Sequence, residues 1–302
     1  MKQPKVLVVG SINIDYIIET EVFPKEGETV SGTGFKKAAG GKGANQAVQL
    51  ARLGADVAMV GALGTDADGR EMRDLLISER LDVSNIADKN LPTGCAVIVL
   101  HNSQNRIIVY SGANGGLVKE DVEFLKNTVS DYDMVVLQLE IPMEINELVA
   151  KYAYEKGIPV FLNTAPFSPI SKELLHYVTY ICANETEAES LSGMVVSQDL
   201  PTVKAAAEKI MSLGAKNVLI TLGSGGAYLC GENLDCYSPA VSGVTVVDTT
   251  AAGDSFIGGF VYAITGGMAT DNALAFANRT ASVTVSRKGA IPSLPKLDEV
   301  TK

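Results

Sequence analysis

Short apolar runs alternate with longer stretches of helical periodicity along most of the chain. Most apolar runs end at glycine, asparagine or an acidic residue, which is typical of buried strands bounded by turns. The runs that we predict to be strands are residues 5–10, 55–61, 134–139, 158–163, 178–183 and 217–223. The helical stretches between them include residues 44–53, 68–79, 145–156 and 202–213. Strands without polar alternation, separated by helices, predict an α/β fold with three αβα layers around a mostly parallel central sheet.

Two segments depart from this alternation, because each contains strand-like runs with no helix between them. They are residues 15–35 and 93–110. Within the second, a polar loop at residues 101–105 separates two apolar runs, which predicts a hairpin. We therefore interpret residues 1–302 as a single α/β domain, with these two segments as an excursion from it.

Polar or small residues stand at the ends of several predicted strands. Ligands of parallel α/β sheets bind beyond the carboxyl ends of the strands. The residues at or just past such ends are Asp15, Glu140, Asn163, Asn184 and Gly223. They are therefore the first candidates for ligand contacts.

Composition and charge narrow the classes of partner. The chain has 302 residues, 46% of them hydrophobic and 20% charged, with a formal net charge of −10. Proteins that bind nucleic acid or anionic membranes depend on Lys and Arg to neutralise phosphate. We expect neither partner, although a nucleotide substrate needs only one local site.

Nothing near the beginning of the sequence resembles a signal peptide, since residues 1–4 lead directly into the first predicted strand. No apolar stretch is long enough to span a bilayer. The cysteines show no paired spacing typical of metal or redox sites, and occur at Cys95, Cys182, Cys230 and Cys236. We expect free thiols and a cytoplasmic location.

The segment of residues 247–259 has the most specific chemistry. A β-branched run at residues 244–247 predicts a strand, and a turn of small residues then leads into a helix that we expect to open at Asp254. The first backbone N–H groups of a helix are unpaired and favour anions such as phosphate. Beside such a site, Asp254 is suited to accept a proton from an attacking hydroxyl. Alternatively, it is an ordinary first-turn aspartate, stabilised by the helix dipole.

Asn13 and Asp15 follow the first predicted strand at alternate positions, so both side chains can point the same way. An amide and a carboxylate placed together can bind adjacent hydroxyl groups. Both residues are also common in simple turns.

A glycine-rich motif precedes a predicted helix at residues 40–47. Its glycines permit a tight turn, while Lys42 and Asn45 offer polar contacts. It is not a phosphate-binding Walker A loop, because Lys36 stands where that motif has glycine and Gly43 follows the lysine.

Together, the segments 247–259 and 40–47 resemble the two signatures of the PfkB family of carbohydrate kinases, in the same order. Further similarity runs from residues 8–13 to residues 287–290, and so covers essentially the whole chain. The resemblance implies that residues 15–35 and 93–110 form a small β-sheet that is a lid over a sugar, and that the lids of two subunits meet in a homodimer.

The resemblance also implies a set of sugar contacts and a catalytic base. The base is Asp254, whose carboxylate would activate the sugar hydroxyl. The other sugar-binding residues implied are Asn13, Asp15, Gly41, Lys42, Asn45 and Glu140. Glu140 alone also fits an exposed acid at the end of a strand.

For the nucleotide, the resemblance implies an anion hole of Ala251, Ala252 and Gly253, although many members have glycine in place of Ala251. The remaining ATP contacts implied are Asn184, Thr221, Leu222, Gly223, Ser224, Gly225, Gly226, Gly253, Asp254 and Asn278. Two local readings stay open beside it. Residues 184–187 fit a helix capping box, and residues 221–226 fit an ordinary glycine turn.

Two metal ions are implied as well. Glu187 would act on Mg²⁺ through a bound water molecule. The positions implied around K⁺ are Asp248, Thr250, Thr284, Arg287, Gly289 and Ser293. Turn chemistry alone also accounts for this set, because carbonyl ligands leave no mark in the side chains.

We therefore expect an ATP-dependent kinase that phosphorylates O5 of ribose, or alternatively a family member acting on 2-deoxyribose, another small sugar or a nucleoside. A dinucleotide-dependent oxidoreductase is disfavoured, because the first strand ends without the glycine fingerprint of that class. A sugar or nucleotide sensor without catalysis is disfavoured by the retention of Asp254 and its small-residue turn.

Overall fold

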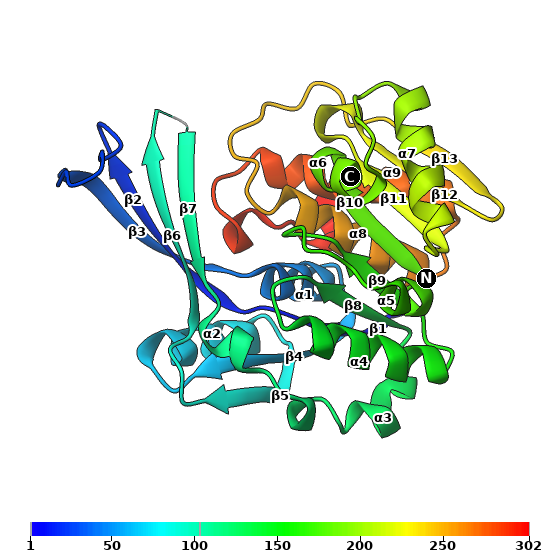
Figure 1. Ribbon diagram of the computed structural model, residues 1–302, viewed down its shortest axis with the longest axis horizontal. Coiled ribbons are helices and arrows are strands. Elements are labelled where there is room, and N and C mark those ends of the chain that lie inside the picture. Colours follow the sequence, from blue (N-terminus) through cyan, green and yellow to red (C-terminus); the bar gives the residue numbers. More distant parts are fainter. Residues whose placement is uncertain (1, 103, 302) are drawn as a thin grey trace.

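The computed structural model describes residues 2–102 and 104–301. Within them, a nine-stranded sheet has the order β13-β12-β11-β10-β9-β8-β1-β4-β5 (Figure 1). Strands β11 to β5 in this order are parallel, and the antiparallel pairs are β11–β12 and β12–β13. The bounds are β1 Lys5–Val9, β4 Asp56–Gly64, β5 Asp82–Lys89, β8 Met134–Gln138, β9 Val160–Asn163, β10 Tyr180–Asn184, β11 Asn217–Thr221, β12 Ala227–Gly231 and β13 Leu234–Ser238. The predicted α/β fold is confirmed.

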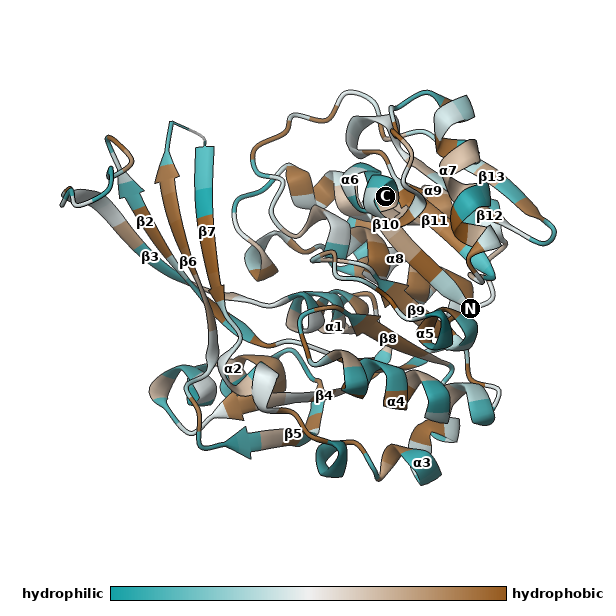
Figure 2. Cartoon of the chain, in the orientation of Figure 1, coloured by the Kyte–Doolittle hydropathy of each residue, from teal (hydrophilic) through white to brown (hydrophobic). Residues whose placement is uncertain are grey.

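Helices cover both faces of this sheet. Val6 and Val8 of β1 pack in one core with helices α1, α2, α8 and α9, whereas Leu7 and Val9 pack in another with α3 to α7. This alternation follows from the two-residue period of a strand, and Figure 2 shows the hydrophobic central strands β8 and β9. The bounds are α1 Lys42–Arg52, α2 Ala67–Ser78, α3 Leu125–Thr128, α4 Met143–Glu155, α5 Lys172–Tyr177, α6 Glu185–Ser192, α7 Leu200–Ser212, α8 Ala252–Thr265, α9 Thr270–Val285 and α10 Leu297–Val300. Among the described helices, none is both long and apolar enough to cross a membrane.

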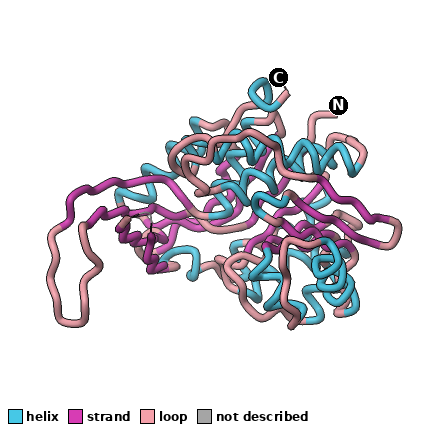
Figure 3. The backbone as a smooth tube through the Cα atoms, turned by 90° about the horizontal axis from the view of Figure 1, so that it is seen from above, coloured by secondary structure: helices cyan, strands magenta, loops and turns pink. Residues whose placement is uncertain are grey.

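A separate four-stranded sheet projects from this body, and we call it the small sheet. Its order is β3-β2-β6-β7, with β2 and β6 parallel and both outer pairs antiparallel. The loop of residues 21–31 between β2 and β3 forms its outer tip (Figure 3). The bounds are β2 Asn13–Thr20, β3 Gly32–Gly40, β6 Gly94–His101 and β7 Gln104–Tyr110.

The hairpin in the small sheet is tighter than the predicted loop of residues 101–105. His101 belongs to β6 and pairs with Gln104 of β7, and Asn105 pairs with Leu100. Ser103 of the predicted loop lies outside the described residues. Asn102 has a φ of 46°, a left-handed conformation that asparagine tolerates better than most residues. Polar character alone therefore overestimated the loop, because polar side chains also occur in exposed strands.

The strand predicted at residues 244–247 is wrong. These residues pair with no strand, and Val246 and Val247 are exposed. The N–H groups of Val247 and Asp248 instead donate to the carbonyl oxygen of Val285, at the end of α9. A β-branched run favours a strand only where a sheet is available to pack against it. The helix after the turn, α8, also begins at Ala252 and not at Asp254.

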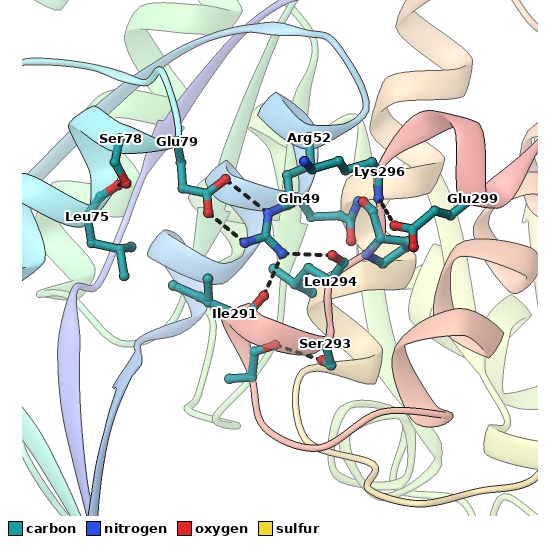
Figure 4. A network of polar contacts seen from close by, with 12 residues as sticks. Gln49, Arg52, Leu75, Ser78, Glu79, Ile291, Ser293, Leu294, Lys296 and Glu299 are labelled. Atoms are coloured by element: carbon teal, nitrogen blue, oxygen red, sulfur yellow. Dashed lines mark hydrogen bonds and ion pairs between the residues drawn. The ribbon is translucent and has the colours of Figure 1, made fainter.

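Arg52, in the last turn of α1, connects this helix to two distant segments (Figure 4). Its Nε and Nη2 donate to the two carboxylate oxygens of Glu79, at 3.0 and 2.5 Å. Its Nη1 donates to the carbonyl oxygens of Ile291 and Leu294, both at 2.7 Å. Gln49, one turn earlier, donates to the carbonyl oxygen of Pro295 at 3.0 Å. The C-terminal end of α1 is therefore fixed, which holds the glycine motif at its other end in place.

Candidate functional site

The N-terminus of α1 packs directly against the connection between β1 and β2. Gly41 has a φ of 89°, and a Cβ there would lie 2.7 Å from the backbone nitrogen of Asn13. A Cβ on Gly43 would lie 2.6 Å from the nitrogen of Ser11. Only glycine permits this approach. It brings Lys42 and Asn45 beside the polar residues that end β1 and begin β2.

Asp254, in the first turn of α8, is buried against the same end of α1. Its Oδ2 accepts a hydrogen bond from Nδ2 of Asn45, and its Oδ1 accepts one from Nε2 of Gln46, both at 2.8 Å. Burial raises the pKa of Asp254, and the opposing influences are the charge of Lys42 and these two hydrogen bonds. A carboxylate of raised basicity that is held by two amides can accept a proton.

Lys42 is the cation at the centre of this group. Burial by itself would lower the pKa of Lys42, but surrounding carboxylates raise it above its ordinary value. Those carboxylates belong to Asp254, Glu140, Glu187 and Asp15. Lys42 therefore remains charged and can stabilise an anion brought among them.

Asn13 and Asp15 occupy alternate positions of β2, as predicted. Oδ1 of Asn13 accepts a hydrogen bond from Nδ2 of Asn114 at 2.7 Å, which fixes the amide. Burial, with a contribution from Glu140, raises the pKa of Asp15 to about 6 against the opposing charge of Lys42. This amide and carboxylate lie on the same face of one strand and can therefore contact neighbouring hydroxyl groups.

Glu140 follows β8 and is held by the glycine motif. Its Oε2 accepts hydrogen bonds from the hydroxyl of Ser11 and from the backbone N–H of Lys42, the latter at 3.1 Å. The hydroxyl of Ser11 also accepts a hydrogen bond from the N–H of Gly43 at 3.3 Å. Glu140 is therefore a fixed acid that connects β8 to α1.

Two cavities meet at the N-terminus of α8. One, of about 250 Å³, is lined by charged and polar residues that include Lys42, Asn184, Glu187 and Asp254. The other, of about 460 Å³, has a largely apolar lining that includes Val244, Val246 and Phe256. The residues that line both are Thr221, Thr249, Ala252 and Gly253. A molecule with an apolar ring and a charged tail can thus span the two cavities.

The backbone at this junction is arranged for an anion. Ala251 has a φ of 60°, in the left-handed region where glycine is favoured. The N–H of Ala252 donates to the carbonyl oxygen of Thr249 at 3.2 Å. The N–H groups of Gly253 and Asp254 have no acceptor among the described residues, and a Cβ on Gly253 would meet nothing within 4 Å. Gly253 therefore presents an open approach to free donors.

Asn184 and Glu187 form the capping box expected at the start of α6. The side chain of Asn184 accepts from the N–H of Glu187 at 2.9 Å, and Oε2 of Glu187 accepts from the N–H of Asn184 at 3.0 Å. Both residues also line the charged cavity. The capping role and a ligand contact are therefore compatible, as the same helix end serves both.

The glycine loop after β11 divides into two groups. Thr221, Gly223, Ser224 and Gly226 line the apolar cavity. Leu222 lies in the core, and Gly225 lines neither cavity. The predicted contacts at Leu222 and Gly225 are thus not among the cavity residues. They instead shape the turn, in which the N–H of Gly225 donates to the carbonyl oxygen of Leu222 at 2.7 Å.

Asn278 of α9 also lines the apolar cavity. Its Nδ2 donates to both oxygens of Ser238, each at 3.0 Å, and to the carbonyl oxygen of Pro239 at 3.1 Å. Asn278 therefore fixes the chain that follows β13, where the wall of this cavity begins.

Three of the positions implied around K⁺ are in direct contact. Oδ1 of Asp248 accepts from the N–H and hydroxyl of Thr250, and Oδ2 accepts from the N–H of Gly289 at 2.8 Å. Burial by itself would raise the pKa of Asp248, but these hydrogen bonds lower it below its ordinary value. Asp248 therefore stays ionised, and its carboxylate offers oxygen ligands suited to a hard cation beside two loops.

The other three positions, Thr284, Arg287 and Ser293, form hydrogen bonds with partners other than Asp248. The hydroxyl of Thr284 lies 2.6 Å from that of Ser255, and its carbonyl oxygen accepts from the N–H of Arg287 at 3.0 Å. The hydroxyl of Ser293 donates to the carbonyl oxygen of Ala290 at 2.7 Å. Their side chains are thus not directed at Asp248. Among the described residues, no three His, Cys, Asp or Glu side chains form a metal-binding group.

Sequence reasoning missed several residues of the site. Ser11, Gln46, Asn114 and Gln138 are buried polar residues that hold Glu140, Asp254 or Asn13, directly or through a neighbour. Gln46 is a polar residue within the glycine motif of residues 40–47, and its place in that motif is a signal that could have identified it. The other three belong to apolar runs or loops, and give no such signal.

A buried carboxylate at a helix N-terminus, where an apolar and a charged cavity meet, is the arrangement expected of a phosphotransferase acting on a hydroxyl group. Residues 3–297 match the model of the pfkB family carbohydrate kinases. The chain belongs to this family.

Relatives and solved structures agree with this assignment. The chain is 40% identical to the ribokinase of Schizosaccharomyces pombe, over 98% of this chain and 96% of that protein. The structure of Arabidopsis thaliana ribokinase complexed with ribose and ATP has a TM-score of 0.91 and 38% identity, over 99% of this chain and 98% of that one. The Thermotoga maritima ribokinase structure has a TM-score of 0.89 and 36% identity, with the same coverage.

We expect Asp15→Asn to stabilise the protein in a pH-dependent way. The folded state binds the proton of Asp15 more tightly than the unfolded chain, so ionisation of Asp15 lowers stability. This loss is absent below about pH 4, grows as the pH rises to about 6 and is complete above that. At pH 8 the variant should gain about 3 kcal/mol in free energy of unfolding, measured with urea.

The control is Asp74→Asn, which changes an exposed aspartate of α2. It should leave the free energy of unfolding nearly unchanged at every pH. A gain of equal size for Asp15→Asn at pH 4 and pH 8 would contradict the prediction.

Proposed function

We propose that this protein is an ATP-dependent kinase that transfers the γ-phosphoryl group to O5 of D-ribose, giving D-ribose 5-phosphate and ADP. The observation that carries the proposal is Asp254, buried at a helix N-terminus where the two cavities meet. The ribokinases to which the chain is similar, one of them complexed with ribose and ATP, support the choice of sugar and nucleotide.

On this proposal, ribose lies between the small sheet and α1. Asn13 and Asp15 hold adjacent hydroxyl groups, and Gly41, Lys42, Asn45 and Glu140 supply the remaining contacts. Asp15 and Glu140 accept hydrogen bonds from hydroxyls, whereas Lys42 donates. Two observations support this arrangement. Hydrogen bonds fix Glu140 and Asn13. The charges of Glu140 and Lys42 shift the pKa of Asp15 because these groups lie close to it. Such fixed groups favour one arrangement of hydroxyls.

Asp254 is the general base of the transfer. The O5–H bond breaks as its proton passes to the Asp254 carboxylate, and O5 bonds to the γ-phosphorus. The bond from this phosphorus to its bridging oxygen breaks at the same centre, and ADP leaves with the electron pair. The N–H groups of Gly253 and Asp254, with Lys42, stabilise charge on the transferring group.

ATP lies across the two cavities. Its adenosine occupies the apolar cavity beside Asn278, Gly223, Ser224 and Gly226, and its phosphates extend past Gly253 into the charged cavity beside Asn184. This orientation places the γ-phosphate near Asp254. The shared lining of the two cavities supports a continuous path for one ligand.

Mg²⁺ accompanies the phosphates, with Glu187 acting on it through water. A carboxylate at the wall of the charged cavity suits a hard cation that keeps several of its waters. When bound, Mg²⁺ neutralises charge on the phosphate oxygens.

K⁺ would be held at the loops joined by Asp248, and the other residues that would hold it, several through backbone carbonyls, are Thr250, Thr284, Arg287, Gly289 and Ser293. The ionised Asp248, hydrogen-bonded to Gly289 and Thr250, provides the supporting observation. Asp248 and Thr250 precede α8, so a cation there would stabilise the turn that leads to the anion-binding N–H groups.

The small sheet acts as a lid and as the interface of a homodimer. Its edge strand β7 exposes a run of apolar side chains, and its other edge strand, β3, exposes one aromatic ring. Those residues are Phe35, Ile107, Ile108, Val109 and Tyr110. An exposed, apolar edge of this kind normally pairs with or packs against another chain.

Asp254→Asn should lower kcat with ribose about 10²- to 10⁴-fold, because the general base is lost. Ribose binding, measured by calorimetry, should be largely retained. Asp271→Asn is the control, since Asp271 also lies in the first turn of a helix but is exposed. Turnover of Asp254→Asn within a few-fold of the wild type would refute the assigned role.

Ribose should exceed 2-deoxyribose in kcat/KM by at least about tenfold, because a site built for a hydroxyl rejects an analogue that lacks it. Hexoses and nucleosides should be poorer still. Asp15→Ala should lose most activity and reduce the preference for ribose over 2-deoxyribose. A substrate panel in which 2-deoxyribose or a nucleoside is better than ribose would refute the proposed sugar specificity but leave the assignment as a kinase intact.

Potassium should raise kcat, and sodium at equal ionic strength should do so poorly. Asp248→Asn should weaken this response, whereas Asp235→Asn, at an exposed position of β13, should preserve it. Equal wild-type rates in the two salts would remove the K⁺ site from the proposal.

The protein should be a dimer by light scattering at micromolar concentration. Ile108 has 72% of its surface exposed, and Ile108→Glu should give a monomer. Val195→Glu, at an exposed position outside the small sheet, should leave the dimer intact. A monomeric wild type would contradict this arrangement.

A further inference from the structure

A chain of hydrogen-bonded, buried amides leads from Asp254 into the protein interior. These amides line neither of the two cavities. Gln46 of α1 donates from Nε2 to Oδ1 of Asp254, and its Oε1 accepts a hydrogen bond from Nε2 of Gln138, both at 2.8 Å. Gln138 ends β8, and its carbonyl oxygen accepts from Nδ2 of Asn146 in α4 at 2.9 Å. Gln46, Gln138 and Asn146 are fully buried. The chain thus crosses the sheet from one helical layer to the other.

The hydrogen bonds give Gln46 a single orientation. Its amide has one donating and one accepting end. Reversing the amide would place its oxygen against the Asp254 carboxylate and its nitrogen against the nitrogen of Gln138. Both contacts would be repulsive, so the acceptor-only carboxylate of Asp254, together with the Nε2 donor of Gln138, favours the orientation in which Gln46 donates to Asp254.

The position of Gln138 is itself constrained by the fold. A Cβ on Gly10 would lie 1.8 Å from Oε1 of Gln138, so the amide fills the space that the absent side chain leaves. That Oε1 has no hydrogen-bond partner among the described residues. Burying such a group is unfavourable, and an apolar residue would pack there without this cost. Packing alone therefore does not explain the amide chain.

We propose that Gln46 is a positioning residue, which, oriented by Gln138, holds Oδ1 of Asp254 and keeps the ionised carboxylate turned toward the charged cavity. The inference rests on the proposed function, in which Asp254 accepts the proton of the sugar. A carboxylate has about four acceptor sites, so the bonds from Gln46 and Asn45 leave room for the sugar hydroxyl.

The charged groups around Asp254 shift its pKa in both directions. Lys42, from α1, favours its ionised form, and Glu140, which follows β8, opposes it. Glu187 and Asp15 act on the same Lys42. Gln46 adds a directional hydrogen bond to this balance, and its removal raises the pKa of Asp254 further.

The test is Gln46→Met, which keeps the length of the side chain and removes its amide. With D-ribose and ATP, we expect plateau kcat to fall about tenfold, because a hydrogen bond to a charged group is lost. The acid limb of the kcat profile should move to higher pH by about one pH unit. The KM values for ribose and ATP should change by no more than about threefold.

Gln49→Met is the matched control. Gln49 is also a fully buried glutamine of α1, but it bonds Pro295 and Ser255 in place of Asp254. It should lower the melting temperature about as much as Gln46→Met while leaving the acid limb in place. Gln138→Met should move the limb in the same direction by a smaller amount. The double variant Gln46→Met/Gln138→Met should match Gln46→Met alone, because Gln138 acts through Gln46.

An acid limb that stays in place in Gln46→Met, or moves equally in Gln49→Met, would overturn the inference, since either outcome reflects a general loss of packing. An additive double variant would overturn the part assigned to Gln138. These outcomes differ from failure of the proposed function, in which the wild type releases no ADP with any acceptor and both proposals fall.

Discussion

The buried carboxylate of Asp254 is the constraint on which the site depends. An ionised group is costly to remove from water unless hydrogen bonds and an opposite charge compensate it. Here the compensation comes from Lys42, Asn45 and Gln46 at the start of α1. The carboxylate comes from α8, more than two hundred residues later. Contact between these two helix ends therefore brings the sugar side and the phosphate side together.

Close backbone approach makes this contact possible. Gly41 and Gly43 allow α1 to pack against the β1–β2 connection, while Arg52 fixes the other end of the helix to Glu79 and to the segment that follows α9. The same region then crowds Asp15, Glu140 and Asp254 around one lysine. Such crowding lowers stability, and the raised pKa of Asp15 records that cost. The scaffold thus supplies the stability that the crowding within the site costs.

Local pattern predicted the parallel strands other than β5, and most of their helices, within a few residues, because continuous apolar runs and helical periodicity are local properties. It missed β12 and β13, which pair antiparallel at the sheet edge, and the long helix α9. It also wrongly predicted a strand at residues 244–247, where Val244 and Val246 instead line a cavity. These failures share one reason, since each outcome depends on which distant segment lies alongside.

The sequence by itself determined the α/β class, the glycine motif, and the small-residue turn before Asp254, because these rest on local residue spacing and backbone conformation. It also provided the family resemblance and the candidate residues. Only the tertiary structure decided that Gln46, Gln138 and Asn146 form a chain to Asp254, and that Ser11 and Asn114 hold Glu140 and Asn13. Hydrogen-bond partners far apart in sequence leave no local pattern, and folding alone brings them within bonding distance.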